Sequence, residues 1–290
     1  MPEPSGRPAP SSLTVPISSC VRELALRAGL RNALRDGLRD WLLFLLLVSG
    51  FVWLVLRGAE ALGYNWQWYQ VPRALFASQD GALSPGPLLQ GLLVTLKLTG
   101  LSFAGAFAVG LAAALLRLSG SWSGRILARG FLELVRNTPL LIQLFFLYFV
   151  LSPVLGMDAF GTAVLGLSLF EGAYVSEILR AGVRSVDSGQ WDAARSLGMG
   201  QGRAYLSVIL PQALRRVLPP LAGQGVSLIK DSSLASVIAI GELTLRGQNI
   251  VSETFLSFEI WFTVAAIYWL VTTALSGAAD ALERRLAYPA

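Results

Sequence analysis

Six long apolar stretches run along the chain, separated by shorter segments that hold most of its charged residues. Each stretch is long enough for a helix to cross the roughly 30 Å hydrocarbon core of a bilayer. The stretches lie near 41–60, 88–116, 126–151, 161–182, 218–241 and 258–280. The pattern therefore predicts an all-α, polytopic membrane protein with six spans.

Polar residues interrupt two of these stretches. Arg136 and Asn137 lie in the third, and Lys230 and Asp231 lie in the fifth. Because a charged side chain that faces lipid costs free energy, we expect both pairs to face protein or water. Pro139 lacks a backbone donor and predicts a kink, which serves either a flexing gate or simple packing.

The composition agrees with a membrane protein and narrows its chemistry. Of the 290 residues, 54% are hydrophobic and 14% are charged, so the apolar surface exceeds what a soluble core of this length can bury. The chain has no His and a single Cys, Cys20, which argues against a metal site and against catalytic residues. The net charge of +5 comes from Arg residues between apolar runs, so we expect no nucleic-acid partner.

The distribution of arginine predicts the orientation in the membrane. Six crossings place both termini on one side, and Arg and Lys concentrate on the cytoplasmic side of membrane proteins. With the N-terminus inside, most Arg residues become cytoplasmic. The exceptions, outside or near the outer interface, are Arg57, Arg73, Arg136 and Arg246. We therefore expect a multi-pass protein with both termini in the cytoplasm.

The N-terminal segments differ in character from the rest. Residues 1–19 are rich in Pro and Ser and predict a disordered tail. Over 20–40, Arg and Leu recur every four residues on adjacent stripes, which predicts a basic amphipathic helix. That helix lies either on the cytoplasmic membrane surface or as a lead-in to the first span. The span at 41–60 is followed by an external loop over 61–87.

The stretch 183–216 becomes the longest internal cytoplasmic loop, and its sequence predicts two short helices. Asp187 or Ser188 is suited to cap the first helix, and Gly198 is suited to the left-handed turn that ends it. A second helix is expected from about 200 to Pro211. A structured cytoplasmic loop in a small membrane protein indicates docking to a soluble partner.

Within this loop, Asp192-Ala193-Ala194 precedes Gly198 and then Val208-Ile209-Leu210-Pro211. This arrangement resembles the Glu-Ala-Ala signature loop of the permease subunits of binding-protein-dependent ABC importers, with Asp192 in place of the usual Glu. Three further segments are similar to the polar amino acid branch of that family, with Asn137 where Gly is more frequent. They are Glu133 to Gln143, Gly172 to Glu177 and Leu228 to Leu234. The resemblance covers roughly 85–285.

The resemblance implies a five-helix type I ABC importer permease core over 88–285, with one extra N-terminal transmembrane helix. It also implies a polar amino acid substrate and a place in the bacterial inner membrane. The implied partners are two ABC ATPase subunits, a second permease subunit, identical or not, and an external solute-binding protein. The loop residues expected to couple ATP hydrolysis to transport are Asp192, Ala193, Ala194, Gly198, Leu210 and Pro211.

ATP itself is not expected to bind to this chain. A phosphate-binding P-loop needs Gly-Lys followed by Ser or Thr, and neither of the two lysines, Lys97 and Lys230, follows a Gly. We expect ATP and Mg²⁺ on the partner subunits and no cofactor on this chain. The alternatives are a permease of the same class for another small solute and a secondary transporter, although the two halves show no internal repeat.

Polar residues inside the predicted spans are candidates for the translocation path. They are Glu171, Tyr174, Arg136, Asn137, Lys230 and Asp231. Glu171 is interpreted either as lining the cavity, where it favours a cationic amino acid, or as paired with an Arg or Lys of a neighbouring helix. Glu177, Arg180 and Arg184 share one helix face and are expected to form ion pairs that steady the coupling loop.

Overall fold

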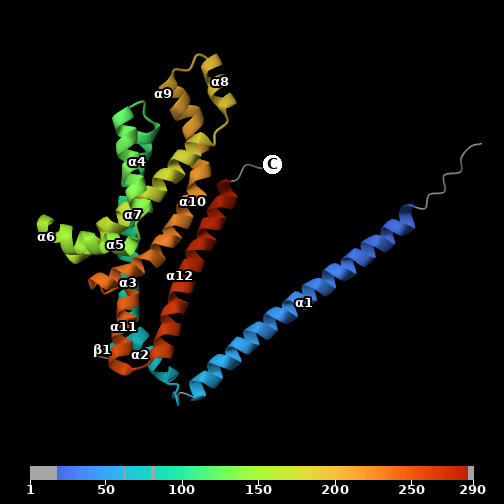
Figure 1. Cartoon of the computed structure of the whole chain (residues 1–290), viewed down its shortest axis with the longest axis vertical. Coiled ribbons are helices and arrows are strands. Elements are labelled where there is room, and N and C mark those ends of the chain that lie inside the picture. Colours follow the sequence, from blue (N-terminus) through green and yellow to red (C-terminus); the bar gives the residue numbers. More distant parts are fainter. Residues whose placement is uncertain (1–17, 62, 80–81, 287–290) are drawn as a thin grey trace, which may run out of the picture. The chain divides into compact units, whose positions relative to one another are not determined.

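The computed structural model describes residues 18–61, 63–79 and 82–286. The chain divides into two compact units, Met1–Trp66 and Gln67–Ala290. Helices dominate both units (Figure 1). The disordered tail predicted over 1–19 lies, apart from its last two residues, outside the described residues.

The described part of the first unit contains one helix of 44 residues, α1 (Ser18–Ala61). This helix joins the segments 20–40 and 41–60 without a break. Its stretch Gly37–Gly58 is long and apolar enough to cross a membrane.

The second unit opens with short elements in the predicted external loop. They are η1 (Trp68–Gln70), α2 (Val71–Leu75), β1 (Phe76–Gln79) and β2 (Ala82–Pro85). The two strands pair antiparallel, with Phe76 opposite Pro85. Gly86 then donates its N–H to the Leu75 carbonyl at 2.7 Å, and a Cβ at Gly86 would fall 2.6 Å from the Leu75 carbonyl carbon. Only Gly permits this close return of the chain.

The remaining elements of the second unit are helical. In chain order they are α3 (Pro87–Leu118), α4 (Trp122–Arg136), α5 (Leu140–Phe146), the π-helical η2 (Leu147–Leu151), α6 (Ser152–Leu155), α7 (Ala159–Arg184), α8 (Ser188–Ser196), α9 (Gln201–Ala204), the π-helical η3 (Tyr205–Ile209), α10 (Leu210–Asp231), the 3₁₀-helical η4 (Ser232–Ile238), α11 (Leu243–Thr254) and α12 (Ser257–Leu286). The all-α, polytopic fold predicted from the sequence is confirmed, and the β1–β2 hairpin is the departure from it among the described residues.

Helices α3 and α7 form the centre of this unit, and small residues let them approach closely. A Cβ at Gly110 of α3 would lie 2.6 Å from Val175 Cγ1 of α7, and the Ser168 hydroxyl donates to the Ser102 carbonyl at 3.2 Å. Between membrane helices, such packing and hydrogen bonding replace the hydrophobic effect as the source of association. A shared core of Leu98, Leu144, Leu167 and Leu228 adds α5 and α10 to this pair.

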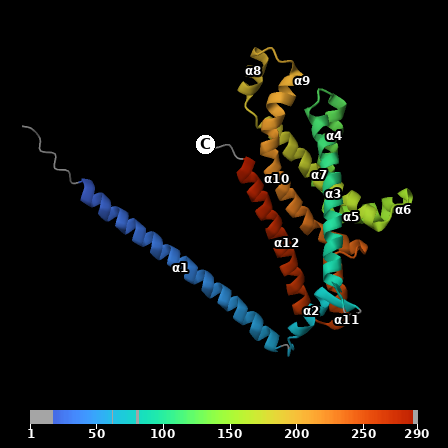
Figure 2. The same cartoon turned by 180° about the vertical axis from the view of Figure 1, so that it is seen from behind.

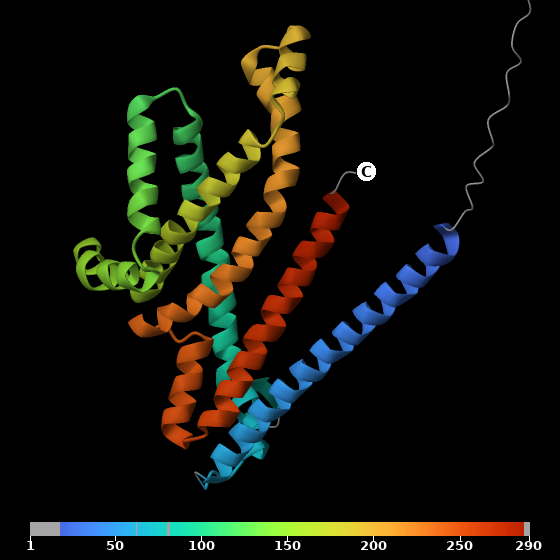
Figure 3. The same cartoon turned by 45° about the vertical axis from the view of Figure 1, so that its right-hand side comes forward.

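Figures 1 and 2 show how the second unit is arranged. The turn between α3 and α4 and the helices α8 and α9 lie at one end, and α11 lies at the opposite end. Helix α12 runs from the α11 end back toward α8, and α5 and α6 project sideways between the two ends (Figure 3). The unit therefore carries the loop 183–216 on the ends of α7 and α10.

Two of the six predicted spans are wrong as continuous helices. The span 126–151 is broken between α4 and α5, which meet at 105°. In the span 218–241, the α-helix ends at Asp231 and the chain continues as the tighter 3₁₀ helix η4. At this point the hydroxyls of Ser232 and Ser233 donate to the carbonyls three residues earlier, each at 2.6 Å. Local serine bonds of this kind compete with the α-helical ladder.

By length and composition, the described helices contain four candidate spans. They are Gly37–Gly58, Pro87–Leu118, Ala159–Arg184 and Ser257–Arg285, and the bent pair α4 with α5 and α6 makes a fifth if it counts as one span. Helix α11, which falls in a predicted external loop, follows the break after Asp231 and is capped by the fully buried Glu242.

Candidate coupling loop and translocation path

Helix α8 is closed at both ends by the residues that the sequence predicts. The Asp187 side chain accepts a hydrogen bond from the Gly189 N–H at 2.6 Å and caps the N-terminus. At the other end, Gly198 has φ +72 and donates to the Arg195 carbonyl at 2.9 Å, while Met199 donates to the Ala194 carbonyl at 3.1 Å. This pair of bonds is a Schellman motif, so the predicted cap and left-handed turn are confirmed.

The second helix of the loop does not end at Pro211, and this prediction is wrong. Helices α9, η3 and α10 continue one another from Gln201 to Asp231. In η3, the Leu210 N–H donates to the Tyr205 carbonyl, five residues earlier, which widens the turn just before Pro211. A wider turn accommodates a residue that lacks a backbone donor, so Pro211 lies in the first turn of α10 instead of ending a helix.

The loop packs firmly on α10. Ala194 is buried, and the ring of Trp191 lies 6.2 Å from that of Tyr205. The Arg216 guanidinium of α10 donates to the Ser185 carbonyl at the end of α7, and the Gln212 amide donates to Gln190 at 3.3 Å. These contacts hold α8 against η3 and α10.

The outer face of α8 is exposed and mixed in character. Leu197 is 81% exposed, and Asp192 and Ala193 are also exposed. Asp192 forms an ion pair with Arg195 at 2.9 Å. Of the other predicted loop residues, Leu210 is half-buried and Pro211 is exposed.

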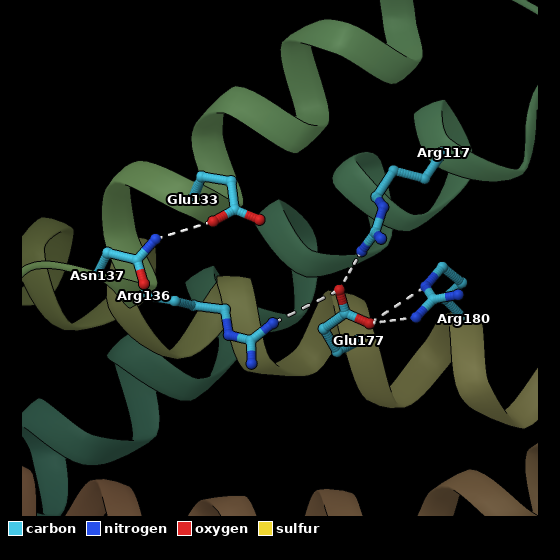
Figure 4. A network of polar contacts seen from close by, with 6 residues as sticks. All are labelled: Arg117, Glu133, Arg136, Asn137, Glu177 and Arg180. Atoms are coloured by element: carbon cyan, nitrogen blue, oxygen red, sulfur yellow. Dashed lines mark hydrogen bonds and ion pairs between the residues drawn. The ribbon is translucent and has the colours of Figure 1, made fainter.

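A second group of polar residues surrounds Glu177 of α7 (Figure 4). Its carboxylate accepts hydrogen bonds from Arg180, at 2.6 Å, and from Arg117 at the end of α3. Arg136, the last residue of α4, lies 3.8 Å from the same carboxylate, and its guanidinium lies 5.8 Å from the centre of the Tyr174 ring. One carboxylate thus faces three guanidinium groups from three helices, which leaves a net positive charge.

This network corrects two expectations. Glu177 and Arg180 form the predicted ion pair, but Arg184 forms none among the described residues, and Arg117 and Arg136 join the pair instead. Arg136 and Arg117 also do not lie on opposite sides of the membrane, as the charge distribution predicted, because both approach Glu177. Because α4 stops at Arg136 instead of crossing, this residue meets the same carboxylate as Arg117, which the charge distribution places on the cytoplasmic side.

A third group lies deeper in α7, around Glu171. This residue is 1% exposed, and its carboxylate accepts a hydrogen bond from the Gln224 amide of α10. Asp231, also from α10, lies close to the Glu171 carboxyl group. The second oxygen of Glu171, Oε1, is buried and has no hydrogen-bond partner among the described residues. The interpretation that Glu171 pairs with an Arg or Lys of a neighbouring helix is wrong for the described residues, where Gln224 is its hydrogen-bond partner. Lys230 is exposed.

The sequence analysis missed two residues of these groups, Gln224 and Arg117, and the buried carboxylate of Glu242. Gln224 lies seven residues before Asp231, so both fall on one face of α10, and this spacing was the available signal. Arg117 carried no signal beyond its charge. Glu242 is fully buried, accepts hydrogen bonds from the N–H groups of Thr244 and Leu245, each at 2.8 Å, and gave no motif to identify it.

Comparison with known proteins identifies the class. Residues 105–288 match the sequence profile of the family described as binding-protein-dependent transport system inner membrane component. The fold and this match define a transmembrane permease subunit of an ABC transporter, and the chain belongs to that family. It is therefore a transport component and not an enzyme, and the alternative of a secondary transporter is set aside.

Individual relatives match about two thirds of the chain. The chain is 40% identical over 202 residues to the glutamine transport system permease protein GlnP of Escherichia coli (strain K12), with 69% of this chain and 92% of GlnP covered. It is 39% identical over 203 residues to the L-cystine transport system permease protein TcyB of Bacillus subtilis (strain 168), with 69% and 87% covered. A solved structure of an amino acid ABC transporter with histidines matches with a TM-score of 0.65 and 39% identity, covering 69% of this chain and 94% of that chain.

Proposed function

We propose that this chain is the permease subunit of an ATP-driven importer that carries polar amino acids across the bacterial inner membrane. The observation that carries the proposal is the 40% identity to a glutamine permease over nearly the whole length of that relative. In the proposed complex, two ABC ATPase subunits hold ATP and Mg²⁺, a second permease subunit completes the path, and an external solute-binding protein delivers the amino acid. Both termini lie in the cytoplasm.

Energy coupling is assigned to the α8 loop. Asp192, Ala193 and Leu197 present an exposed face, and the Schellman turn at Gly198 holds that face at the tip of the unit. Closure of the ATPase subunits pushes this face, and the push passes to α7 and α10 through the contacts that bind the loop to them. The close approach of Gly182 to Val217, where a Cβ would lie 2.0 Å from Val217 Cγ2, makes α7 and α10 move together.

The translocation path is assigned to the polar groups on α7 and their partners. Arg136, beside Asn137, presents a guanidinium over Tyr174 and is the least committed cation of the Glu177 network, since its side chain is 47% exposed. It is suited to receive a substrate carboxylate. Glu171 lies one helical turn before Tyr174 on α7, and Asp231 follows Lys230 on α10. The two carboxyl groups supply negative charge and are suited to a substrate ammonium or guanidinium group.

The test is reconstitution of the complex in lipid vesicles with its ATPase and solute-binding protein. Amino acids are expected to stimulate ATP hydrolysis and to accumulate inside the vesicles. Leu197→Ser is expected to reduce this stimulation severalfold while the complex still folds, because the side chain is exposed in the isolated chain. Trp122→Ser is the matched control, an exposed apolar residue at the start of α4 and outside the α8 loop. Equal losses in both variants would assign coupling elsewhere.

A further inference from the structure

The bend between α4 and α5 leaves backbone carbonyls that need hydrogen-bond donors. Helix α4 ends at Arg136, and the chain turns by 105° before α5 begins at Leu140. The last carbonyls of any helix lack intrahelical donors, and a membrane offers no water to replace them. Pro139 contributes no N–H, and of the three residues in the bend, Asn137 supplies one donor, to the Glu133 carbonyl at 3.2 Å.

Two side chains supply the missing donors. The Thr138 hydroxyl donates to the Leu134 carbonyl at 2.8 Å. The Gln143 amide nitrogen, from the first turns of α5, donates to the Val135 carbonyl at 2.7 Å and lies 3.0 Å from the Thr138 carbonyl and 2.8 Å from the Thr138 hydroxyl. Gln143 therefore joins both sides of the bend through one amide group.

The Val135 carbonyl belongs to the peptide bond that leads into Arg136. Holding this peptide fixes the direction in which the Arg136 side chain leaves α4. That side chain reaches Glu177 at 3.8 Å and the face of Tyr174 at 5.8 Å. Neither contact is short, so a small rotation of the last turn of α4 is enough to break both.

We propose that Gln143 is a positioning residue for Arg136: its amide closes the end of α4 and thereby holds the Arg136 guanidinium between Glu177 and Tyr174. The inference rests on the proposed function in one respect, because Arg136 is assigned to the translocation path. It also makes the bend a fixed corner. Of the two interpretations of Pro139, packing is favoured over a flexing gate.

The test is a double-mutant cycle in the reconstituted complex. Gln143→Met keeps the length of the side chain and removes its donor, and Arg136→Gln removes the guanidinium. Each single variant is expected to lower amino acid uptake roughly tenfold, and the double variant is expected to fall no further than Arg136→Gln alone, because residues that act through one another are not additive. Gln90→Met is the control, since the Gln90 amide also donates to a backbone carbonyl, that of Pro85 at 2.8 Å. Gln90 lies at the start of α3, at the other end of that helix from the Glu177 network.

A second readout does not depend on transport. Thermal unfolding midpoints are measured in detergent for the wild type, the two single variants and the double variant. The shift of the midpoint in the double variant is expected to be smaller than the sum of the shifts in the single variants. Midpoint shifts that add, together with uptake losses that multiply, would overturn the inference. If the wild-type complex imports no amino acid, the proposed function fails and the unfolding cycle still decides the role of Gln143. Thr138→Val, which removes the second donor of the bend, replaces Gln143→Met if that variant does not fold.

Discussion

The Glu177 carboxylate of α7 accepts a hydrogen bond from the Arg117 guanidinium at the end of α3, although the two residues are 60 positions apart in the sequence. Arg180 donates to the second oxygen of the same carboxylate at 2.6 Å. The bond ties the last turn of the first core helix to the helix that leads into α8. Any movement of the loop to which we assign energy coupling would therefore reach α3 through a charged contact as well as through packing.

Replacement of Glu177 by Gln is expected to destabilise the protein by about 1–3 kcal/mol, because three guanidinium groups lose the negative charge that they share, and one of its two acceptor oxygens, while remaining close together. The measurement is the unfolding midpoint in detergent. Glu133→Gln is the matched control, because Glu133 is exposed and accepts one hydrogen bond, from Asn137 at 2.8 Å. A shift in Glu177→Gln no larger than in the control would show that the network contributes nothing to stability.

Substitution of Gly198 by Ala is expected to loosen the coupling loop. Gly198 has φ +72, a conformation that costs an L-residue about 1–2 kcal/mol, although a Cβ there meets no atom within 4 Å. The predicted result is reduced amino acid-stimulated ATP hydrolysis in a complex that assembles normally. Gly202→Ala in α9 is the control, since it has the same open surroundings without the left-handed backbone. Full stimulation in Gly198→Ala would contradict the assigned role of the turn.

The contact between Gly182 and Val217 offers a test with a rescue. A Cβ at Gly182 would lie 2.0 Å from Val217 Cγ2, so Gly182→Ala is expected to separate α7 from α10 and cost about 1–3 kcal/mol. Adding Val217→Ala makes room for the new methyl group and is expected to restore the unfolding midpoint and the stimulated ATP hydrolysis in part. Gly223→Ala, also in α10 but with no atom near the added Cβ, should leave both unchanged. A double variant no better than Gly182→Ala alone would rule out the proposed contact.

The membrane class and the capped helix α8 could be predicted because they depend on local signals. Apolar length identifies a span, Asp187 and Gly198 are strong capping residues, and each acts within a few positions of itself in the chain. The same local rules failed at Pro211. A π-helical turn in η3 absorbed its missing donor, and nothing in the sequence indicates such a turn.

The polar networks could be predicted only in part, because their members come from distant helices. The Glu177 to Arg180 pair lies on one helix and follows from spacing, but the contributions of Arg117 and Arg136 depend on how α3 and α4 pack on α7. Spacing within one helix gives no information on contacts of this kind between helices, and the bend after Arg136 gave no signal either. Hydropathy detects the apolar length of a segment and is insensitive to a turn inside it.

Exchange of Glu171 for Gln tests the assignment of a cation-preferring path. The substitution keeps the size of the side chain and leaves an oxygen for the Gln224 amide, so the fold is expected to persist. It removes the negative charge of the carboxylate that we assign to the path. With a solute-binding protein that accepts both cationic and neutral amino acids, the preference for Arg or Lys over neutral amino acids is expected to drop roughly tenfold, the change that about 1.4 kcal/mol of lost charge attraction produces. Initial uptake rates measure it, with Glu133→Gln as the control. Unchanged relative uptake in Glu171→Gln would remove Glu171 from the path and leave it a structural partner of Gln224 and Asp231.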